Sequence, residues 1–177
     1  TYSDLFEEQV TYCPLIDKYN TADSKEKYQS VYEIREENGD RRIAQNAEKW
    51  WYSCCAPRHP YASYHIDDDG YSPVVYSWMQ YANDVVGNLY WSTTFYLEYV
   101  SEKNSKVYNA LQDCYSTAMR FPPANGDGFL LYPGAPYGIY GPVGSIRLQQ
   151  ILDGLEEYVM GLAEKRRRLR HQTKLLK

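Results

Sequence analysis

The sequence predicts an α/β fold in which strands alternate with helices. Three observations favour it. Short aromatic or β-branched segments are bounded by proline or glycine, longer segments carry apolar residues at helical spacing, and the two kinds of segment alternate along the chain. Because strands that alternate with helices usually form parallel sheets, the expected core is a parallel sheet, open or closed, with helices packed against it.

The first part of the chain is expected to contribute two strands and the helices between them. Residues 9–16 predict a short strand, and a helix is expected over residues 24–38. Residues 41–47 are expected to continue as a second, shorter helix. The next predicted strand, 49–55, is rich in aromatic residues and is bounded by Pro57.

The second part is expected to add two helices and two strands. A helix is predicted over residues 72–86, where serine can cap the first turn and proline suits its start. Strands are predicted at 88–93 and 129–132, residues 96–121 are ambiguous, and a long helix is predicted over 145–168. The apolar faces expected for the two helices consist of Val75, Trp78, Met79, Ala82 and Val86, and of Leu148, Ile151, Leu152, Leu155, Tyr158, Val159 and Leu162.

Length and charge limit the classes of protein to consider. The 177 residues suffice for one domain with a sizeable core, whereas a complete eight-fold βα barrel typically needs about 250. The net charge of -4 gives no overall basic field for nucleic acid, and no stretch of about 18 apolar residues predicts a membrane span. Residues 165–177 contain seven Lys and Arg residues and are expected to form a solvated, frayed basic tail. The start of the chain shows no export signal, and the sequence predicts no compartment.

The cysteines and the loop after the second predicted strand contain residue types that can bind metal ions. The four cysteines are expected to be buried thiols, and the adjacent Cys54 and Cys55 would point to opposite faces of a strand. His59 and His65 do not have the spacing of a zinc site, and the Asp67–Asp69 run lacks the calcium-loop pattern. No metal site and no cofactor are therefore expected.

Aromatic residues at the expected strand ends are candidates for ligand binding. The chain has 20 Tyr and 4 Trp but only 4 Phe. Tyr and Trp combine a flat apolar face with a polar edge, which suits sugar rings but suits a tyrosine-rich core equally well. The aromatic platform would consist of Trp50, Trp51, Tyr52, Tyr90 and Trp91, and alternation along a strand would send one residue of each adjacent pair inward.

The sequence Gly126-Asp127-Gly128 predicts a tight turn, because glycine tolerates backbone angles that other residues avoid. Arg147 lies in the first turn of the last predicted helix, where the helix dipole does not favour a cation. We expect Arg147 to pair with a carboxylate such as Asp153 or Asp127, and contact with a ligand is the alternative.

Five motifs occur in the order found in a known family. They lie at residues 48–61, 87–91, 126–134, 144–148 and 153–158. From about Val10 to Leu162 the chain resembles the catalytic domain called domain of unknown function 4091, which is related to glycoside hydrolase family 123. The resemblance implies a β/α barrel preceded by a β-sandwich. It also implies retaining hydrolysis of terminal N-acetylgalactosamine-type sugars, with the substrate's acetamido group as the nucleophile.

The resemblance makes the expected fold class α/β, as the C-terminal part of a TIM-like (β/α)8 barrel. Residues 1–164 would form this portion and residues 165–177 the basic tail. The family's Asp-Glu pair lies upstream of the matched part, so the catalytic residues of this chain are unknown. The expected substrate-binding residues of the late barrel wall are Trp51, Tyr52, Tyr90, Trp91 and Asp127. The last helix departs from the family pattern at Leu152 and Val159.

The expected function is therefore part of a glycoside hydrolase that acts on terminal N-acetylhexosamine-type sugars. Whether this chain is itself an enzyme stays open, because no catalytic carboxylate pair is recognisable in it. The alternatives are a non-catalytic carbohydrate-binding module and a structural fragment that a partner chain completes. The expected partners are a carbohydrate and the remaining barrel segment or a companion chain. Self-association is also expected, because an open parallel sheet exposes apolar surface and unpaired edge groups.

Overall fold

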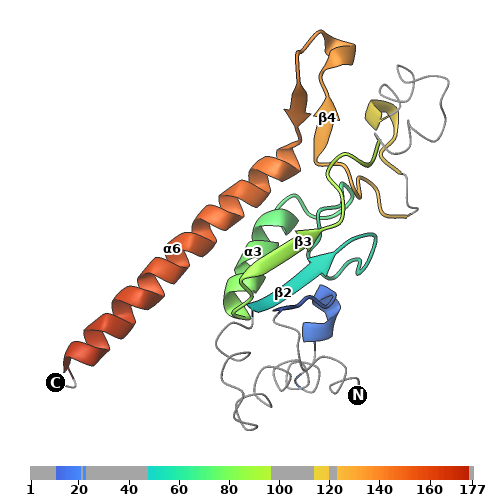
Figure 1. The fold of residues 1–177 in the computed structure, drawn as a ribbon. Helices are drawn as coiled ribbons and strands as arrows, with labels where there is room; N and C mark the ends of the chain where they lie inside the picture. The colour runs from blue at the N-terminus through green and yellow to red at the C-terminus, as the bar shows by residue number, and fades with distance from the viewer. Residues whose placement is uncertain (1–10, 21, 23–47, 97–113, 120–122, 176–177) are drawn as a thin grey trace.

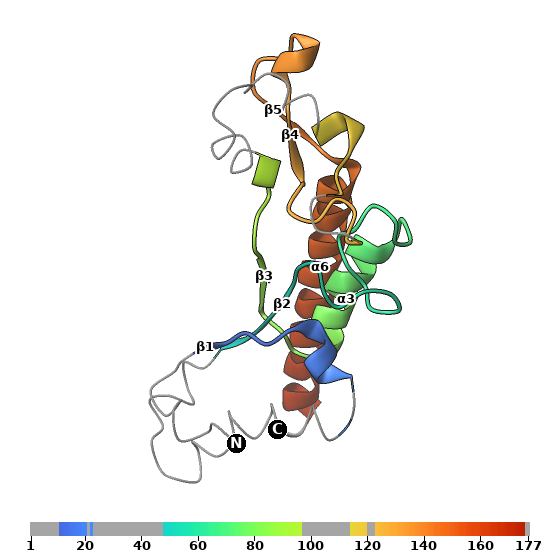
Figure 2. The same ribbon diagram turned by 90° about the vertical axis from the view of Figure 1, so that its right-hand side faces the viewer.

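The computed structural model describes residues 11–20, 22, 48–96, 114–119 and 123–175. The two helices expected over 24–38 and 41–47 lie outside these residues. Figure 1 shows the arrangement of the described elements, and Figure 2 shows it from the side. In chain order they are β1 (Thr11–Tyr12), the 3-10 helix η2 (Ile16–Tyr19), β2 (Glu48–Ser53), α3 (Ser72–Ala82), β3 (Gly87–Tyr90), β4 (Leu131–Pro133), the 3-10 helix η3 (Ala135–Tyr137), β5 (Pro142–Gly144) and α6 (Ile146–Leu175).

The first three strands form a parallel sheet in the order β1-β2-β3, as the alternation of strands and helices predicts. Trp50 of β2 pairs with Gly87 of β3, and Ser53 pairs with Tyr90. The described strands do not close into a barrel, so the observed architecture is a mixed α/β fold with a small open sheet.

The fourth strand does not join this sheet, contrary to the expectation of continued parallel pairing. β4 instead pairs antiparallel with β5, and the hairpin projects away from the sheet (Figure 1). The Gly- and Pro-rich connection turns the chain back, since Gly138 and Gly141 have φ angles of 69° and 107°. The amide of Gly134 donates to the carbonyl of Gly141 at 3.1 Å, which closes the turn.

The two long helices pack side by side, as both ribbon views show. Gly154 of α6 lies against Ser77 and Val74 of α3, and a Cβ atom at Gly154 would meet the Ser77 Oγ at 2.8 Å. Small residues on both helices thus allow a close approach. The helix predicted over 72–86 ends at Ala82, and Trp78 and Val86 are exposed rather than buried. Val75 and Met79 pack against the core as predicted, whereas the fully buried side chains of α3 include Tyr76, Ser77 and Gln80.

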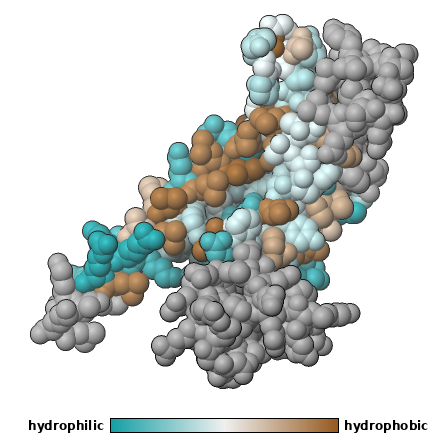
Figure 3. All heavy atoms as spheres, viewed as in Figure 1, coloured by the Kyte–Doolittle hydropathy of each residue, from teal (hydrophilic) through white to brown (hydrophobic). Residues whose placement is uncertain are grey.

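The last helix is longer than predicted. α6 continues to Leu175, so the region expected to be a frayed tail is helical. Lys165 pairs with Asp84 at 2.7 Å, which ties this part of α6 to the end of α3. Apolar side chains gather along α6 on the surface (Figure 3). They include three members of the predicted stripe, namely Leu152, Leu155 and Val159.

The two faces of the parallel sheet differ in burial. On the face that α3 covers, the Trp51 ring is 0% exposed and lies between Tyr19 and Tyr76, with ring centroids 5.6 and 5.5 Å away. We call this the covered face. Residues at the alternate positions, Trp50, Tyr52 and Leu89, point the other way, and Leu89 is 44% exposed. We call this the exposed face.

The core lies between the covered face, α3 and the first half of α6. Its buried side chains are Ile16, Tyr19, Trp51, Ala62, Tyr64, Tyr76, Val85 and Leu130. A second, smaller cluster contains Tyr96, Cys114, Ala118 and Phe129. Within the described part of the chain, no helix is both long enough and apolar enough to cross a membrane.

Candidate functional site

The turn at Gly126-Asp127-Gly128 lies beyond the carboxyl end of β3. Both glycines have a φ angle of 80°, a value that side-chain-bearing residues rarely adopt. A Cβ atom at Gly126 would meet Ile66 at 2.6 Å, and one at Gly128 would meet the Trp91 ring at 2.8 Å. Glycine is therefore required at both positions for the backbone angle and for the close approach, and Asp127 is held inward between them.

Asp127 is the centre of a buried hydrogen-bonded cluster. Its side chain is 1% exposed, and its Oδ1 accepts hydrogen bonds from the Tyr90 hydroxyl at 3.0 Å and from the Trp91 Nε1 at 2.9 Å. The Tyr90 hydroxyl also accepts the Gly128 amide hydrogen at 2.7 Å. Three of the five predicted binding residues thus come together, because the chain leaves β3 at Tyr90 and turns both aromatic side chains toward Asp127.

The electrostatics of this cluster keep Tyr90 a proton donor. Burial, and then the negative charge of Asp127, raises the pKa of Tyr90 well above its usual range. The second carboxylate oxygen of Asp127, Oδ2, is buried and has no hydrogen-bond partner among the described residues. A buried carboxylate oxygen without a donor is costly, so this position suits a donor from outside the described residues.

Arg147 holds the turn around Asp127 in place through hydrogen bonds. Its guanidinium donates to the backbone carbonyls of Gly126, at 2.9 Å, and of Tyr64 and Phe129. It also donates to the Tyr132 hydroxyl at 3.3 Å. The expectation that Arg147 pairs with a carboxylate is wrong. The planar guanidinium group, which carries several N–H donors, binds backbone carbonyls of the loops instead. Asp153, the other expected partner, accepts a hydrogen bond from Gln149 on the exposed side of α6.

The other two predicted residues, Trp51 and Tyr52, lie apart from this cluster and on opposite faces of β2. Trp51 is enclosed in the core, at the floor of a small pocket of about 360 Å³ that Tyr19, Tyr61 and Met79 also line. Tyr52 is half-buried on the exposed face. Nothing in the structure tests whether these side chains bind a ligand, so their roles stay predictions.

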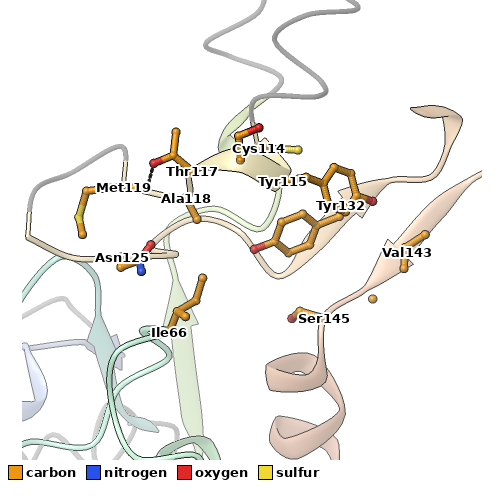
Figure 4. A pocket seen from close by; sticks show the side chains of 12 residues that line it. Ile66, Cys114, Tyr115, Thr117, Ala118, Met119, Asn125, Tyr132, Val143 and Ser145 are labelled. Atoms are coloured by element: carbon orange, nitrogen blue, oxygen red, sulfur yellow. Dashed lines mark hydrogen bonds between the residues drawn. The ribbon is translucent and has the colours of Figure 1, made fainter. Parts of the chain in front are cut away.

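A larger pocket of about 620 Å³ lies between residues 114–119 and the base of the β4–β5 hairpin. Figure 4 shows its lining side chains, with Tyr115 and Tyr132 on one side and Met119 and Asn125 on the other. The two tyrosine rings lie 5.3 Å apart between centroids. Aromatic faces beside hydroxyl and amide groups suit a sugar ring. The sequence interpretation missed Tyr115 because it lies in the ambiguous region 96–121.

The loop after β2 is held together by its own polar side chains. His65 is buried, and its Nε2 lies 2.8 Å from the Cys54 carbonyl. The Ser63 hydroxyl donates to Asp68 and accepts the His65 amide hydrogen at 3.0 Å. Within the described ranges, no group of three or more His, Cys, Asp or Glu side chains is placed to hold a metal ion. Ser63, His65 and Asp68 thus have hydrogen-bond partners within the loop, and Asp67 accepts a hydrogen bond from the Asn125 side chain at 2.9 Å.

Comparison with known protein families matches residues 7–160 to the glycoside hydrolase 123 catalytic domain. A comparison with curated proteins found no match. The family match confirms the relation that the five motifs indicate, whereas membership of the domain of unknown function 4091 family stays a prediction. Because the match covers most of the 177 residues, the chain belongs to the glycoside hydrolase 123 catalytic domain family.

Proposed function

We propose that this chain forms the C-terminal part of a glycoside-hydrolase barrel that acts on terminal N-acetylhexosamine-type sugars. The family match supports the hydrolase class. One strand followed by one helix is the repeating unit of such a barrel, and three parallel strands with a helix on one face fit consecutive units of this kind. The sites of such barrels lie beyond the carboxyl ends of the strands. In this proposal, residues 1–164 belong to the barrel and residues 165–177 are the basic tail, of which the described part up to Leu175 continues α6.

The buried Asp127 carboxylate carries the proposal. Tyr90 and Trp91 orient its Oδ1, and its Oδ2 has no donor among the described residues. Because Oδ2 is buried, the loops around the turn would have to open before a sugar hydroxyl or the N–H of an acetamido group could supply that donor. A charge-assisted hydrogen bond of this kind is stronger than a neutral one. Asp127 would therefore bind and orient the substrate, and we assign it no catalytic role.

The catalytic carboxylates are proposed to come from outside this part of the barrel. Glycoside hydrolysis needs two carboxyl groups at the scissile bond, or one together with the acetamido group of the substrate. The Tyr90–Trp91–Asp127 cluster supplies one oriented carboxylate. A remaining barrel segment or a companion chain would add the acid/base residues, and it would also cover the exposed face of the sheet.

The proposal is tested by titrating the chain with N-acetylgalactosamine and N-acetylglucosamine, with galactose for comparison, and following binding by calorimetry. Asp127→Asn keeps the shape but replaces one acceptor oxygen by a donor group. It should weaken binding by about tenfold or more, which corresponds to about 1.4 kcal/mol. Asp153→Asn is the matched control, because Asp153 lies on the exposed surface of α6. Equal affinities of Asp127→Asn and the parent would contradict the assigned role.

Hydrolysis is tested separately with nitrophenyl N-acetylhexosaminides. The chain alone should not turn them over, because we place the acid/base carboxylates elsewhere. The native protein, assayed with any companion chain that it holds, should release nitrophenol. Turnover by the chain alone would overturn the proposed division of the active site.

A non-catalytic carbohydrate-binding module is the second candidate. The larger pocket with Tyr115 and Tyr132 favours it, because two tyrosine rings beside polar groups can bind a sugar without any catalytic carboxylate. Sugar binding that survives Asp127→Asn but is lost in Tyr132→Ala, without turnover by the native protein, would favour this candidate. A structural fragment would show neither binding nor turnover.

A further inference from the structure

Two adjacent cysteines follow the carboxyl end of β2. The Sγ atoms of Cys54 and Cys55 lie 4.0 Å apart, and both side chains are half-buried. The expectation that they point to opposite faces is wrong, because β2 ends at Ser53 and both residues lie in the turn beyond it. Neighbouring side chains that would alternate on a strand are thus brought together.

The turn holds Cys54 in place through backbone contacts. The Cys54 amide donates to the Ala56 carbonyl at 3.0 Å, and the Cys54 carbonyl lies 2.8 Å from the His65 Nε2. The Cys54 Sγ also contacts the Ala56 carbonyl at 3.5 Å. A disulfide bond needs the sulfur atoms at about 2.05 Å, so the side chains would have to approach by about 2 Å. Adjacent Cα atoms lie about 3.8 Å apart across a trans peptide, which is below the usual range of about 4.4–6.8 Å for disulfide-bonded cysteines. Side-chain rotation and a distortion of the peptide between Cys54 and Cys55 would both be needed, and a bond strained in this way is readily reduced.

We propose that Cys54 and Cys55 form a reversible dithiol–disulfide couple beside the Asp127 cluster. The reaction is exchange with a small disulfide such as oxidised glutathione. One cysteine thiolate attacks the small disulfide and releases the first small thiol. The second cysteine then attacks the resulting mixed disulfide and releases the second. The two cysteines lose two hydrogens in forming the S–S bond, and the small disulfide is reduced to two thiols.

The surroundings of the pair link it to the candidate site. Burial and the neighbouring Cys54 thiol, followed by the charge of Asp127, raise the pKa of the Cys55 thiol. The loop that begins at Cys54 also contacts the turn around Asp127, because the Ile66 amide donates to the Asn125 carbonyl at 2.8 Å. Disulfide formation would replace two ionisable thiols near that carboxylate by an apolar bridge. This inference does not depend on the proposed function, because it concerns only the oxidation state of the pair.

Tryptic cleavage separates this pair of cysteines from the other two, so the oxidation state of the pair can be measured by itself. Trypsin cleaves after Lys and Arg, so cleavage after Lys49 and Arg58 gives one peptide that contains Cys54 and Cys55 and neither Cys13 nor Cys114. The folded chain is equilibrated in buffers with increasing ratios of oxidised to reduced glutathione, and the remaining thiols are alkylated. The peptides are then measured by mass spectrometry.

The proposal predicts that peptide 50–58 loses both alkyl labels and two hydrogens as the buffer becomes oxidising, and regains both labels on reduction. In Cys54→Ser or Cys55→Ser, the remaining cysteine should instead carry one glutathione. Cys13→Ser is the matched control and should bridge as the parent does. The proposal is overturned if peptide 50–58 keeps two labels, if it retains glutathione, or if it is cross-linked to the peptide of Cys13. The parent chain alone decides between these outcomes, whether or not a variant folds.

Discussion

The covered and exposed faces of the parallel sheet have similar residue types but different surroundings. Trp50 and Trp51 are neighbours in β2, yet Trp51 is enclosed by Tyr19 and Tyr76, whereas Trp50 lies across Gly87 on the exposed face. Parallel sheets are normally covered on both sides. The covered face therefore accounts for the stability of this chain, and the exposed face is where we expect the rest of a barrel to pack.

The largest effect should come from Trp51→Ala. Removing this enclosed ring should lower the free energy of unfolding by about 3–5 kcal/mol, because the transfer free energy and the resulting cavity add. Trp50→Ala is the matched control on the exposed face and should lower it by about 1 kcal/mol, in line with partial burial. Urea denaturation followed by circular dichroism measures both. Similar losses for the two variants would mean that the faces do not differ as described.

Arg147→Met should have the next largest effect. It removes the donor to three backbone carbonyls of the loops that carry the Asp127 turn. Leaving those buried carbonyls without a partner should lower the free energy of unfolding by about 2–4 kcal/mol. The exposed Arg168 is the control, and Arg168→Met should leave the free energy nearly unchanged. A small loss for Arg147→Met would show that water replaces the guanidinium at these carbonyls.

High pH should destabilise the covered side through its buried tyrosines. Burial raises the pKa of Tyr64, Tyr76 and Tyr90. Above the unfolded tyrosine pKa of about 10, the unfolded chain releases protons that the native chain retains. The contribution of these tyrosines to the free energy of unfolding is therefore fully present below a pH of about 10. Above that pH, each of the three tyrosines lowers the free energy of unfolding by about 1.4 kcal/mol per pH unit.

Urea titrations at a series of pH values around and above the unfolded tyrosine pKa measure this slope. Tyr64→Phe should make it shallower, because it removes one buried phenol. Tyr140→Phe is the control, since the Tyr140 ring is fully exposed at the hairpin. A free energy of unfolding that does not change over this pH range would contradict the burial of the three hydroxyls.

The smallest effect on stability is expected for Leu89→Ser on the exposed face. The free energy of unfolding of the chain should change by less than about 0.5 kcal/mol, as for most surface positions. Association with the remaining barrel segment or companion chain should nevertheless weaken, because Leu89 would lie in that interface. Tyr140→Ser at the hairpin tip is the control and should alter neither property. Unchanged association of Leu89→Ser, measured by light scattering, would place the interface elsewhere.

The sequence could predict the parts of the fold that follow from local pattern. Alternating strands and helices predicted the parallel pairing of β1 to β3, and the two glycines around Asp127 predicted the tight turn. The pattern of apolar and polar residues could not predict the antiparallel pairing of β4, because a short aromatic strand has the same pattern in a parallel and in an antiparallel sheet. The burial of Trp51 rather than Trp50 depends on the phase of β2 relative to α3, which the sequence of β2 alone does not contain.

The contacts of the candidate site depend on residues far apart in the chain. Arg147 binds the carbonyl of Tyr64 in the loop after β2 and the carbonyls of Gly126 and Phe129 in the turn around Asp127. Every residue has a backbone carbonyl, so the sequence does not indicate which carbonyls Arg147 binds. From residue types alone, a carboxylate is the expected partner of an arginine. The sequence also predicts that Tyr90 and Trp91 point to opposite faces of a strand. Because β3 ends at Tyr90, Trp91 lies outside the strand and both side chains reach Asp127.

The most direct test of the central claim is the mass of the native protein and its assembly. Intact mass spectrometry combined with size-exclusion light scattering measures both. We predict a longer native chain, or a tightly held second chain, that covers the exposed face of the sheet. A stable monomer of 20.7 kDa would contradict the claim, because the sheet would then persist without the rest of a barrel.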